Sequence, residues 1–449
     1  MAVASERGLR IAVIGTGVSG LAAAWLLCRR HEVTVFEQDL RIGGHCHTVE
    51  VATPGQAVPV DTGFIVYNPP NYPNLSALFE HLATPTRTAE MSFAVSRHGG
   101  DFEYAGTSLS TLFAQPRNVL RPAFWSMLAD IRRFYRDAPG ELGGSAHGSE
   151  TLGAFLDRGG YGAAFRDDHL LPMAAAIWSS PAATMLNCPA QAFVRFFDNH
   201  GLLKLRARPE WRTVIGGSQA YVGRLTRPFA DRIRTNSRVV DVVRGAPGVT
   251  VTDQHGNSAD FDHVVIATHA DQALSLLRDA NADERRLLGS FRYTQNRAVL
   301  HSDASFMPRR RMVWSSWNYV EGVARDGNDA QITYWMNRLQ GLPGDRRLFV
   351  TLNPRQQPNL TIHDEIYAHP TFDVAAVGAQ RALWSLQGRR KTWFCGAYFG
   401  AGFHEDGLQA GLAVAEDLGG VRRPWTVECE SDRVVRTNPN LTARRMELT

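Results

Sequence analysis

The sequence contains very little lysine and cysteine. Only two of its 48 basic residues are lysines, Lys204 and Lys391, and its formal net charge is +4. No dense basic run with interleaved aromatic residues is present, which argues against a nucleic-acid partner. The five cysteines are Cys28, Cys46, Cys188, Cys395 and Cys429. Because they include no C-x-x-C pair, the sequence predicts neither a disulfide framework nor a cysteine-based zinc site, and it favours a reducing, cytoplasmic setting.

Long apolar runs are also absent. The first residues, MAVASERGLR, lack the apolar core of a signal peptide, and the apolar run that starts at Ile11 is interrupted by glycine within five residues. No other segment reaches the roughly 18 apolar residues that cross a bilayer. With 449 residues, the chain is long enough for two or three lobes around a large interior. The composition predicts a multi-lobed globular protein that does not span a membrane.

What is present begins with a strand, a glycine-rich turn and a helix. The apolar runs Leu9–Ile14 and Glu32–Phe36 flank a small-residue helix predicted over Gly20–Arg30. The turn has the G-x-G-x-x-G spacing, in which the glycines allow a tight turn, close approach of a pyrophosphate and close packing of the helix on the strand. The helix N-terminus favours an anion. The predicted pyrophosphate contacts are Gly15, Gly17, Val18, Ser19 and Gly20.

An acidic residue follows the second strand at the position of a ribose ligand. Glu37 lies 22 residues after Gly15 and precedes Gln38, which we include in the predicted site. A carboxylate about 20 residues beyond the glycines accepts hydrogen bonds from ribose hydroxyls. This unit predicts a dinucleotide site, but by itself it fits NAD and FAD equally well.

The next motif favours FAD. The segment Arg41–His45 reads R-I-G-G-H, in which adjacent glycines let the backbone approach a ligand and the arginine can hold a phosphate. A glutamate followed by R-x-G-G resembles the FAD-contacting signature of the flavin amine oxidase and phytoene desaturase superfamily, where many members have arginine in place of His45. The V-D-T-G-F and S-R-V-V segments resemble later elements of the same superfamily. The resulting predicted contacts are Arg41, Gly43, Gly44, His45, Thr62, Gly63 and Val239.

The C-terminal stretch W-F-C-G-A-Y-F-G-A-G-F-H-E-D-G-L-Q-A-G strengthens the resemblance. Flavin amine oxidases have here a strand, a turn with glycine and acidic residues, and a helix whose N-terminus faces the flavin ring and stabilises its reduced anion. The resemblance implies that Gly396 closes the strand and that Asp406, Gly407 and Leu408 lie against the flavin. Some members attach the flavin to a cysteine in this region, where the present chain has His404, so non-covalent FAD is the predicted cofactor.

The order of these motifs predicts an α/β fold. A Rossmann-like FAD-binding domain of the glutathione-reductase type is expected over residues 1–68, 211–290 and 390–420. A substrate domain with helices and an antiparallel sheet is expected over 69–210 and 291–389, followed by a peripheral tail over 421–449. The segment 107–203 is predicted to be mostly helical. The sheet is predicted from apolar runs at Ala298–Ser302, Met312–Trp317, Gln331–Met336 and Phe349–Leu352.

A narrower resemblance concerns the substrate. R-I-G-G-H-C-H-T, V-D-T-G-F-I-V-Y-N and F-C-G-A-Y-F-G-x-G-F-H-E-D-G resemble a bacterial group of FAD-dependent oxidoreductases related to the flavoprotein part of plant cyclopropane fatty acid synthases. The group implies a lipid or other hydrophobic substrate, and one of its activities is desaturation of a methylated fatty acyl chain of phospholipid on the way to furan fatty acids. Amine oxidation is the alternative, although neither lysine lies where such enzymes hold a water. A non-catalytic flavin-binding partner of a lipid enzyme is a third interpretation.

Candidate substrate-handling residues are less distinct. His404 is the candidate for handling a proton or positioning the substrate, and a histidine that merely caps the turn is an equal alternative. The H-C-H segment around Cys46 predicts no metal site, since neighbouring residues point to opposite faces and no further ligand is evident. The basic and apolar segment Leu112–Tyr135 fits either a helix at the inner face of the cytoplasmic membrane or an ordinary amphipathic helix. Aromatic residues expected to wall the substrate are Trp178, Phe193, Phe196, Phe197, Trp314, Trp317, Tyr319, Tyr334 and Trp335.

Overall fold

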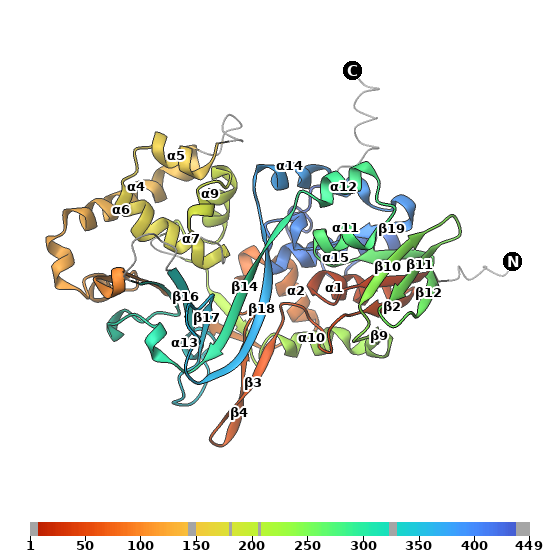
Figure 1. The fold of residues 1–449 in the computed structure, drawn as a ribbon, viewed down its shortest axis with the longest axis horizontal. Helices are drawn as coiled ribbons and strands as arrows, with labels where there is room; N and C mark the ends of the chain where they lie inside the picture. The colour runs from red at the N-terminus through yellow and green to blue at the C-terminus, as the bar shows by residue number, and fades with distance from the viewer. Residues whose placement is uncertain (1–7, 142–149, 179–181, 205–207, 323–329, 437–449) are drawn as a thin grey trace.

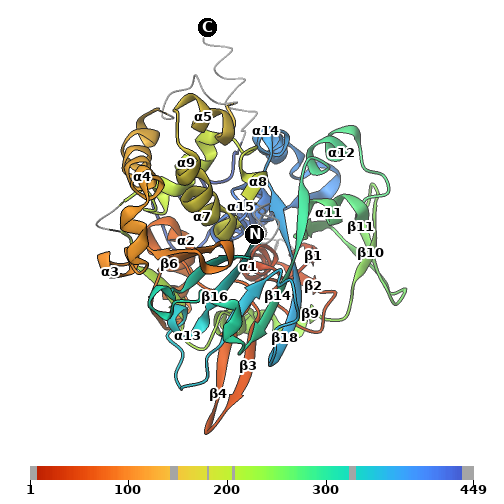
Figure 2. The same ribbon diagram turned by 60° about the vertical axis from the view of Figure 1, so that its left-hand side comes forward.

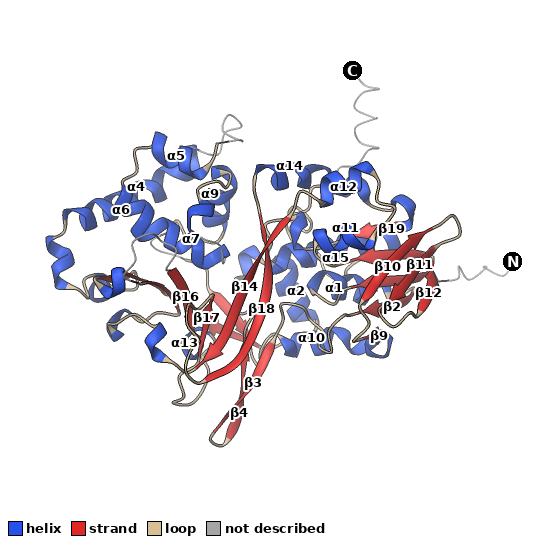
Figure 3. Ribbon diagram, viewed as in Figure 1, coloured by secondary structure: helices blue, strands red, loops and turns tan. Residues whose placement is uncertain are grey.

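The computed structural model describes residues 8–141, 150–178, 182–204, 208–322 and 330–436. Figure 1 shows a lobe of helices on one side, long strands in the middle, and a sheet surrounded by helices on the side of the N-terminus. In Figure 3 the longest strands, β14 and β18, run between these two sides. The predicted α/β architecture, with helices and a largely antiparallel sheet inserted into a nucleotide-binding fold, is confirmed.

Five parallel strands form the sheet that carries the glycine-rich turn. Their order is β19-β13-β1-β2-β9, so β1 lies in the middle. The strands are β1 (Arg10–Ile14), β2 (Glu32–Phe36), β9 (Ile233–Arg234), β13 (His263–Ile266) and β19 (Thr392–Phe394). The chain leaves β1 toward β2 on one side, while β13 lies on the other side. A ligand site is therefore expected at the carboxyl end of β1, where the strand order reverses.

Two largely buried helices pack on each other beside this sheet, α1 (Val18–Leu27) and α15 (His404–Gly419). The remaining helices of this half are α2 (Pro73–His81), α10 (Gln219–Thr226), α11 (Ala270–Leu276), α12 (Ala282–Leu288) and α14 (Val374–Leu383). A separate antiparallel sheet contains β10 (Val239–Arg244), β11 (Val249–Asp253) and β12 (Ser258–Phe261). One apolar core fills the space between these elements, which explains why both strands and helices here are rich in valine, leucine and alanine.

A seven-stranded sheet occupies the middle of the molecule, in the order β18-β14-β17-β16-β15-β6-β7. Its strands are β6 (Phe93–Arg97), β7 (Phe102–Ala105), β14 (Arg292–His301), β15 (Trp317–Glu321), β16 (Ala330–Trp335), β17 (Phe349–Leu352) and β18 (Thr361–Thr371). All neighbours are antiparallel except β6 and β15. The predicted strand at Met312–Trp317 is wrong, because Arg311–Val313 forms a 3-10 turn and the Trp314 indole donates a hydrogen bond to the Pro308 oxygen at 2.7 Å.

The predicted helical segment is confirmed. It comprises α3 (Leu109–Leu112), α4 (Pro122–Glu141), α5 (Leu152–Arg158), α6 (Ala163–Phe165), α7 (Leu171–Trp178), α8 (Ala182–Met185) and α9 (Ala190–Asn199). Buried phenylalanines from four of these helices form a core of their own. The remaining helices and strands are the short helix α13 (Met336–Leu339) and two antiparallel strand pairs. The first pair is the hairpin of β3 (Thr48–Thr53) and β4 (Gln56–Asp61), and the second joins the distant strands β5 (Thr86–Ala89) and β8 (Trp211–Val214).

The part of the C-terminal tail that the structure describes, up to residue 436, is packed against the molecule. The Arg423 side chain is buried and forms an ion pair with Glu416 at 2.7 Å. The Trp425 ring stacks on Trp25 of α1 at 5.7 Å between centroids. These contacts stabilise the tail because they bury an aromatic ring and satisfy a buried charge. Within the described residues, no helix is both long enough and apolar enough to cross a membrane.

Candidate functional site

The glycine-rich turn follows β1 and forms the base of the site. Gly15 adopts a φ of +101°, which a residue with a side chain rarely adopts. A methyl group on Gly20 would lie 2.0 Å from the Gly15 oxygen, so only glycine allows α1 to start this close to the strand. A methyl group on Gly17 would meet no atom within 4 Å, so space is open in front of this residue. Gly15 and Gly20 thus meet the conformational and packing requirements that their spacing predicts, and the contact of Gly17 with a pyrophosphate stays a prediction.

The N-terminus of α1 has room for an anion. Its N-cap residue, Gly17, supplies no side-chain acceptor, and the first turn, which begins with Val18 and Ser19, contains no acidic residue. The backbone N–H groups of this turn are therefore available to an external acceptor, and the helix dipole favours a negative charge there. This is the observation that tests the fit of a dinucleotide, and a pyrophosphate satisfies it.

Glu37 lies at the carboxyl end of β2 and is nearly buried. Its carboxylate accepts hydrogen bonds from the Thr16 backbone N–H and the Asp39 backbone N–H, each at 3.0 Å, and from the Thr16 hydroxyl. The acid is thereby fixed next to the glycine-rich turn, as the spacing predicts for a ribose ligand. The neighbouring Gln38 is exposed, and Val239 is a buried residue of β10 in the same core as β2.

The R-I-G-G-H loop faces the turn. Gly43 and Gly44 have φ values of +112° and +56°, and a methyl group on Gly44 would lie 3.1 Å from the Gly17 Cα. The two glycine motifs therefore meet backbone to backbone. The Arg41 guanidinium donates to the Gly44 oxygen at 2.8 Å and to the Cys46 oxygen at 3.1 Å. In this arrangement Arg41 holds the loop in its conformation, and a contact of Arg41 with phosphate stays a prediction.

Histidines surround this loop. The His45 ring lies 5.4 Å from that of His369 and 6.3 Å from that of His269, between centroids. Burial, and next the two neighbouring imidazoles, hold the pKa of His45 well below its usual value. His45 is therefore neutral at pH 7, unlike the arginine that many family members have here. A phosphate bound nearby would favour its protonated form.

The C-terminal turn reaches the same place. Gly396 follows β19, and α15 starts next to α1. A methyl group on Gly407 would lie 2.8 Å from the Ser19 hydroxyl, and one on Gly411 would lie 2.1 Å from the Ser19 oxygen. Leu408 is fully buried between them. The structure thus brings the predicted residues from both ends of the chain together at the carboxyl edge of the parallel sheet.

The two acidic residues of the C-terminal turn, Glu405 and Asp406, form hydrogen bonds with backbone groups at helix ends. The Asp406 carboxylate accepts a hydrogen bond from the Phe403 N–H at 2.7 Å and forms an ion pair with Arg433 at 3.1 Å. Glu405 accepts hydrogen bonds from the backbone N–H groups of Asn74 at 3.0 Å and Leu75 at 2.9 Å, which caps α2. Both acids have raised pKa values, mainly because they are buried. Their side chains stabilise helix ends. The direct contact of Asp406 with flavin that the resemblance implies stays a prediction.

His404 belongs to a buried polar chain. Its Nε2 atom lies within hydrogen-bond distance of the Tyr221 hydroxyl, which lies 2.9 Å from the Cys46 sulfur, and its ring stacks on Phe64 at 3.9 Å. Burial lowers the pKa of His404 to about 3 and raises the pKa values of the Cys46 thiol and the Tyr221 hydroxyl. At pH 7 the thiol, the tyrosine hydroxyl and the imidazole are therefore all uncharged. This chain links α15, α10 and the R-I-G-G-H loop.

The Asp-Thr-Gly segment is anchored by β18. The Thr62 hydroxyl pairs with the Tyr367 hydroxyl at 2.7 Å, and a methyl group on Gly63 would lie 2.1 Å from the His45 oxygen. Tyr367, Tyr221 and Thr16 are residues that sequence reasoning missed. The signal for Tyr367 was present, since His363, Glu365, Tyr367 and His369 alternate along one face of a strand. For Tyr221 no local signal exists, because its partners come from distant segments.

The predicted aromatic wall is divided. Trp178 and Phe196 lie 4.6 Å apart, and Phe196 stacks on Phe403 at 4.6 Å, immediately before α15. Trp178 and Phe196 form one group with Phe193 and Phe197. Trp314 packs instead against Trp335 in a separate cluster, and Trp317, Tyr319 and Tyr334 belong to the core of the seven-stranded sheet. Only the first group reaches the start of α15.

The site combines two glycine-containing turns, a glutamate at the position of a ribose ligand and the N-termini of two helices. On a Rossmann-like sheet, this combination defines a dinucleotide-dependent flavoprotein. The model of the flavin containing amine oxidoreductase family matches residues 18–301. The chain belongs to this family, binds FAD and is a flavin-dependent oxidoreductase. No curated protein sequence matches it.

Solved structures share the fold. A fatty acid isomerase from P. acnes that produces CLA is 16% identical, with a TM-score of 0.66 over 93% of this chain and 99% of that chain. Cyclohexylamine oxidase from Brevibacterium oxydans IH-35A is also 16% identical, with a TM-score of 0.66 over 92% and 99%. Putrescine oxidase bound to putrescine is 16% identical, with a TM-score of 0.65 over 92% and 99%. At this identity, the similarity establishes the fold only.

Proposed function

We propose that this flavoprotein removes hydride from a fatty acyl chain of membrane phospholipid, with a methyl-branched chain as the expected substrate. The observation that carries the proposal is a set of four exposed apolar side chains in the segment 109–125 of the helical lobe, called the patch below. They are Leu109, Val119, Leu120 and Trp125, of which Leu109 is 75% and Leu120 is 83% exposed. Figure 2 shows α3 and α4, which bear part of the patch, at the outer edge of the molecule. Exposed apolar residues gathered in this way are typical of a membrane contact.

The patch is rigid and has basic neighbours. The Trp125 indole donates to the Val119 oxygen at 2.8 Å, which holds the start of α4 against the preceding turn. Arg117 and Arg121 both donate to the Asp101 oxygen and lie in the same segment. Apolar side chains flanked by arginines suit the boundary between acyl chains and anionic headgroups. We therefore limit the proposed membrane contact within the segment Leu112–Tyr135 to the part around residues 119–125, since Phe124, Met127 and Phe134 are buried in the core as in an ordinary amphipathic helix.

An apolar substrate also agrees with the surroundings of α15. The aromatic group of Trp178, Phe196 and Phe403 extends from the helical lobe to the residue before this helix. Neither lysine offers a polar group there, since Lys204 is exposed and the Lys391 ammonium donates to the Pro247 oxygen at 2.8 Å. A protein of the same fold is described as a fatty acid isomerase, so the fold serves an acyl chain in at least one other case. These observations favour the lipid substrate over an amine.

The residues have separate tasks in this reaction. FAD would accept the hydride, and the proton lost from the neighbouring carbon as the C=C bond forms would pass to solvent. Gly15, Gly17 and the start of α1 would hold the pyrophosphate of FAD, and Glu37 would hold its ribose. The aromatic group excludes water from the reacting C–H bond. His404 has a pKa lowered to about 3, so it is neutral and a poor proton acceptor at pH 7, and it would instead position the loop that contains Cys46 through Tyr221.

The test uses purified holoprotein under anaerobic conditions. Vesicles of anionic phospholipid with methyl-branched acyl chains should bleach the visible flavin band, and mass spectrometry should show acyl chains lighter by two hydrogens. Putrescine or cyclohexylamine should leave the band unchanged. Bleaching by amines with peroxide formation in air, and none by lipid, would establish amine oxidation instead. A yellow protein that neither class reduces would favour a non-catalytic flavin-binding partner.

The patch has its own test. Leu120→Asp should weaken binding to the same vesicles about tenfold or more. The leucine would insert among the acyl chains, whereas the aspartate is repelled by the anionic surface. Leu360→Asp is the matched control, because Leu360 is 69% exposed on the central sheet and its φ of +55° suits aspartate. Equal vesicle binding by the two variants would contradict the assignment of the patch.

A further inference from the structure

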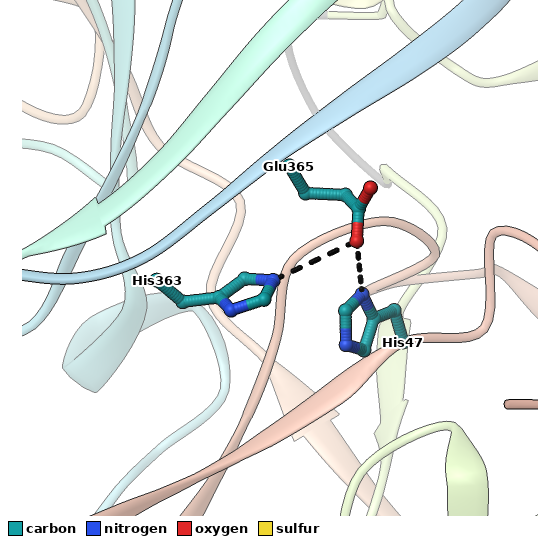
Figure 4. A group of neighbouring side chains, drawn as sticks. All are labelled: His47, His363 and Glu365. Carbon is teal, nitrogen blue, oxygen red and sulfur yellow. Dashed lines mark ion pairs between the residues drawn. The ribbon is translucent and has the colours of Figure 1, made fainter. Parts of the chain in front are cut away.

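Three potential ligand side chains meet where the loop before β3 passes β18. Figure 4 shows the rings of His47 and His363 directed toward the Glu365 carboxylate. The distance from His47 Nδ1 to Glu365 Oε2 is 3.4 Å, and that from His363 Nε2 to the same oxygen is 3.7 Å. The three ligand atoms all lie within 4.8 Å of one another. His363 and Glu365 are two residues apart on β18 and therefore share a face of the strand.

We propose that His47, His363 and Glu365 bind a divalent transition-metal ion of the zinc class. Two imidazoles and one carboxylate are a donor set that zinc uses with a fourth position left open. With metal–ligand bonds of about 2.0–2.1 Å, neighbouring ligand atoms of a tetrahedral ion lie about 3.4 Å apart. The two distances to Glu365 are close to this value, so small side-chain rotations would bring the three atoms around one ion.

The hydrogen bonds of the group agree with a metal. The His47 side chain is buried, and its Nδ1 atom faces the Glu365 carboxylate. His363 Nε2 is buried and has no hydrogen-bond partner among the described residues. At 3.7 Å the carboxylate is too far to be one. A buried ring nitrogen left unpaired beside a carboxylate is costly without an ion between them.

The neighbouring groups are compatible with an ion. The Tyr367 hydroxyl lies 3.1 Å from His47 Nδ1, and it keeps Thr62 as a partner when His47 turns to the metal. The cation Arg41 lies near His47, and the Glu365 carboxylate stands beside the two imidazoles. His45 and Cys46 take no part, since they pack toward His369 and Tyr221.

The ion would connect two parts of the molecule. His47 ends the loop that contains the R-I-G-G-H glycines, whereas His363 and Glu365 belong to the central sheet. Bound metal would therefore restrict the position of this loop relative to β18. The inference is independent of the proposed acyl substrate, because it concerns only the ligand set and its occupant.

The experiment uses tag-free holoprotein, dialysed against EDTA and then freed of chelator. Titration with ZnCl2 by calorimetry should show one equivalent bound per chain, and CoCl2 should give the visible absorption of a four-coordinate ion. His363→Gln and Glu365→Gln should each weaken zinc binding at least about tenfold. His255→Gln, which changes an exposed histidine of the small antiparallel sheet, is the matched control and should bind zinc as the unaltered protein does.

FAD content and melting temperature, measured in parallel, show that the variants are folded. His363 and Glu365 are only partly buried, so both variants should keep the flavin and the fold. The proposal is overturned if the unaltered protein binds less than half an equivalent of zinc, or if His363→Gln and His255→Gln bind it with the same affinity. If the unaltered protein binds zinc but does not turn over lipid, the proposed function is refuted while the metal site is retained.

Discussion

Replacing Gly411 by alanine tests whether the site depends on the close packing of α15 on α1. The added methyl group would lie 2.1 Å from the Ser19 oxygen and 2.9 Å from the Ser19 carbonyl carbon. Both atoms belong to the backbone, so no side chain can rotate away, and α15 must shift by about 1 Å to restore normal contact. Overpacking of this kind costs about 1–3 kcal/mol or more, whereas the gain in helix propensity is at most about 1 kcal/mol.

The shift would also affect the cofactor. Gly407, one turn earlier in α15, packs on Val18 and Ser19 at the start of α1, so a displaced α15 disturbs the helix end that receives the pyrophosphate. We expect Gly411→Ala to lower the unfolding free energy by about 1–2 kcal/mol and to weaken FAD binding. Urea denaturation of the apoprotein and quenching of flavin fluorescence measure the two effects.

Gly378→Ala is the matched control. Gly378 lies in the middle of α14, and a methyl group there would meet no atom within 4 Å. The same substitution should therefore leave FAD binding unchanged and raise the unfolding free energy by up to about 1 kcal/mol. If Gly411→Ala is as stable as Gly378→Ala and binds FAD as well, the packing argument is wrong.

Three further predictions concern acids and a histidine of the site. Glu37→Gln should weaken FAD binding about 10- to 100-fold, because an amide cannot replace a charged acceptor of hydrogen bonds; a dissociation constant within twofold of the unaltered protein would refute this role. The pKa of His404 is about 6.5 in the unfolded chain and about 3 in the folded protein. Its contribution to stability is therefore complete above pH 6.5 and is lost as the pH falls. Between pH 6.5 and 5 the loss is about 2 kcal/mol, so His404→Gln should show a flatter decline of unfolding free energy with acid. Glu405→Gln should lower the melting temperature by removing the cap of α2, with a loss of about 1–3 kcal/mol, and an unchanged melting temperature would contradict the cap.

The direction of the pKa shift of His404 determines that acid lowers the stability. Folding lowers the pKa of His404 relative to the unfolded chain because the buried imidazole is neutral. Acid therefore protonates the unfolded chain first and draws the equilibrium toward it. His47 and His369, whose pKa values are lowered to about 4, add to the same acid sensitivity. Asp61, whose pKa is raised to about 6, has the opposite effect over the same pH range, so the test compares the slope of each histidine variant with that of the unaltered protein.

Local sequence was sufficient for the parts of the site that are built from backbone. A turn that needs glycine reveals itself in the spacing, because only glycine fits the φ of Gly15 and the close contact of Gly20, whereas Gly17 leaves the space in front of the turn open. The strand and helix that flank this turn were predicted within two or three residues for the same reason. The strand predicted at Met312–Trp317 was wrong because its buried residues Val313 and Trp314 lie at a 3-10 turn, which a local apolar pattern does not distinguish from a strand.

The sequence by itself determined the cofactor, the family and the glycine cradle, since these depend on short motifs with fixed backbone requirements. Tertiary structure alone decided how side chains from distant segments are used. It turned Glu405 and Asp406 into helix caps, joined His404 to Tyr221 and Cys46, and brought His47 against β18. The physical reason is that the partner of a buried polar group is fixed by packing in space, and neighbours in space need no common spacing along the chain.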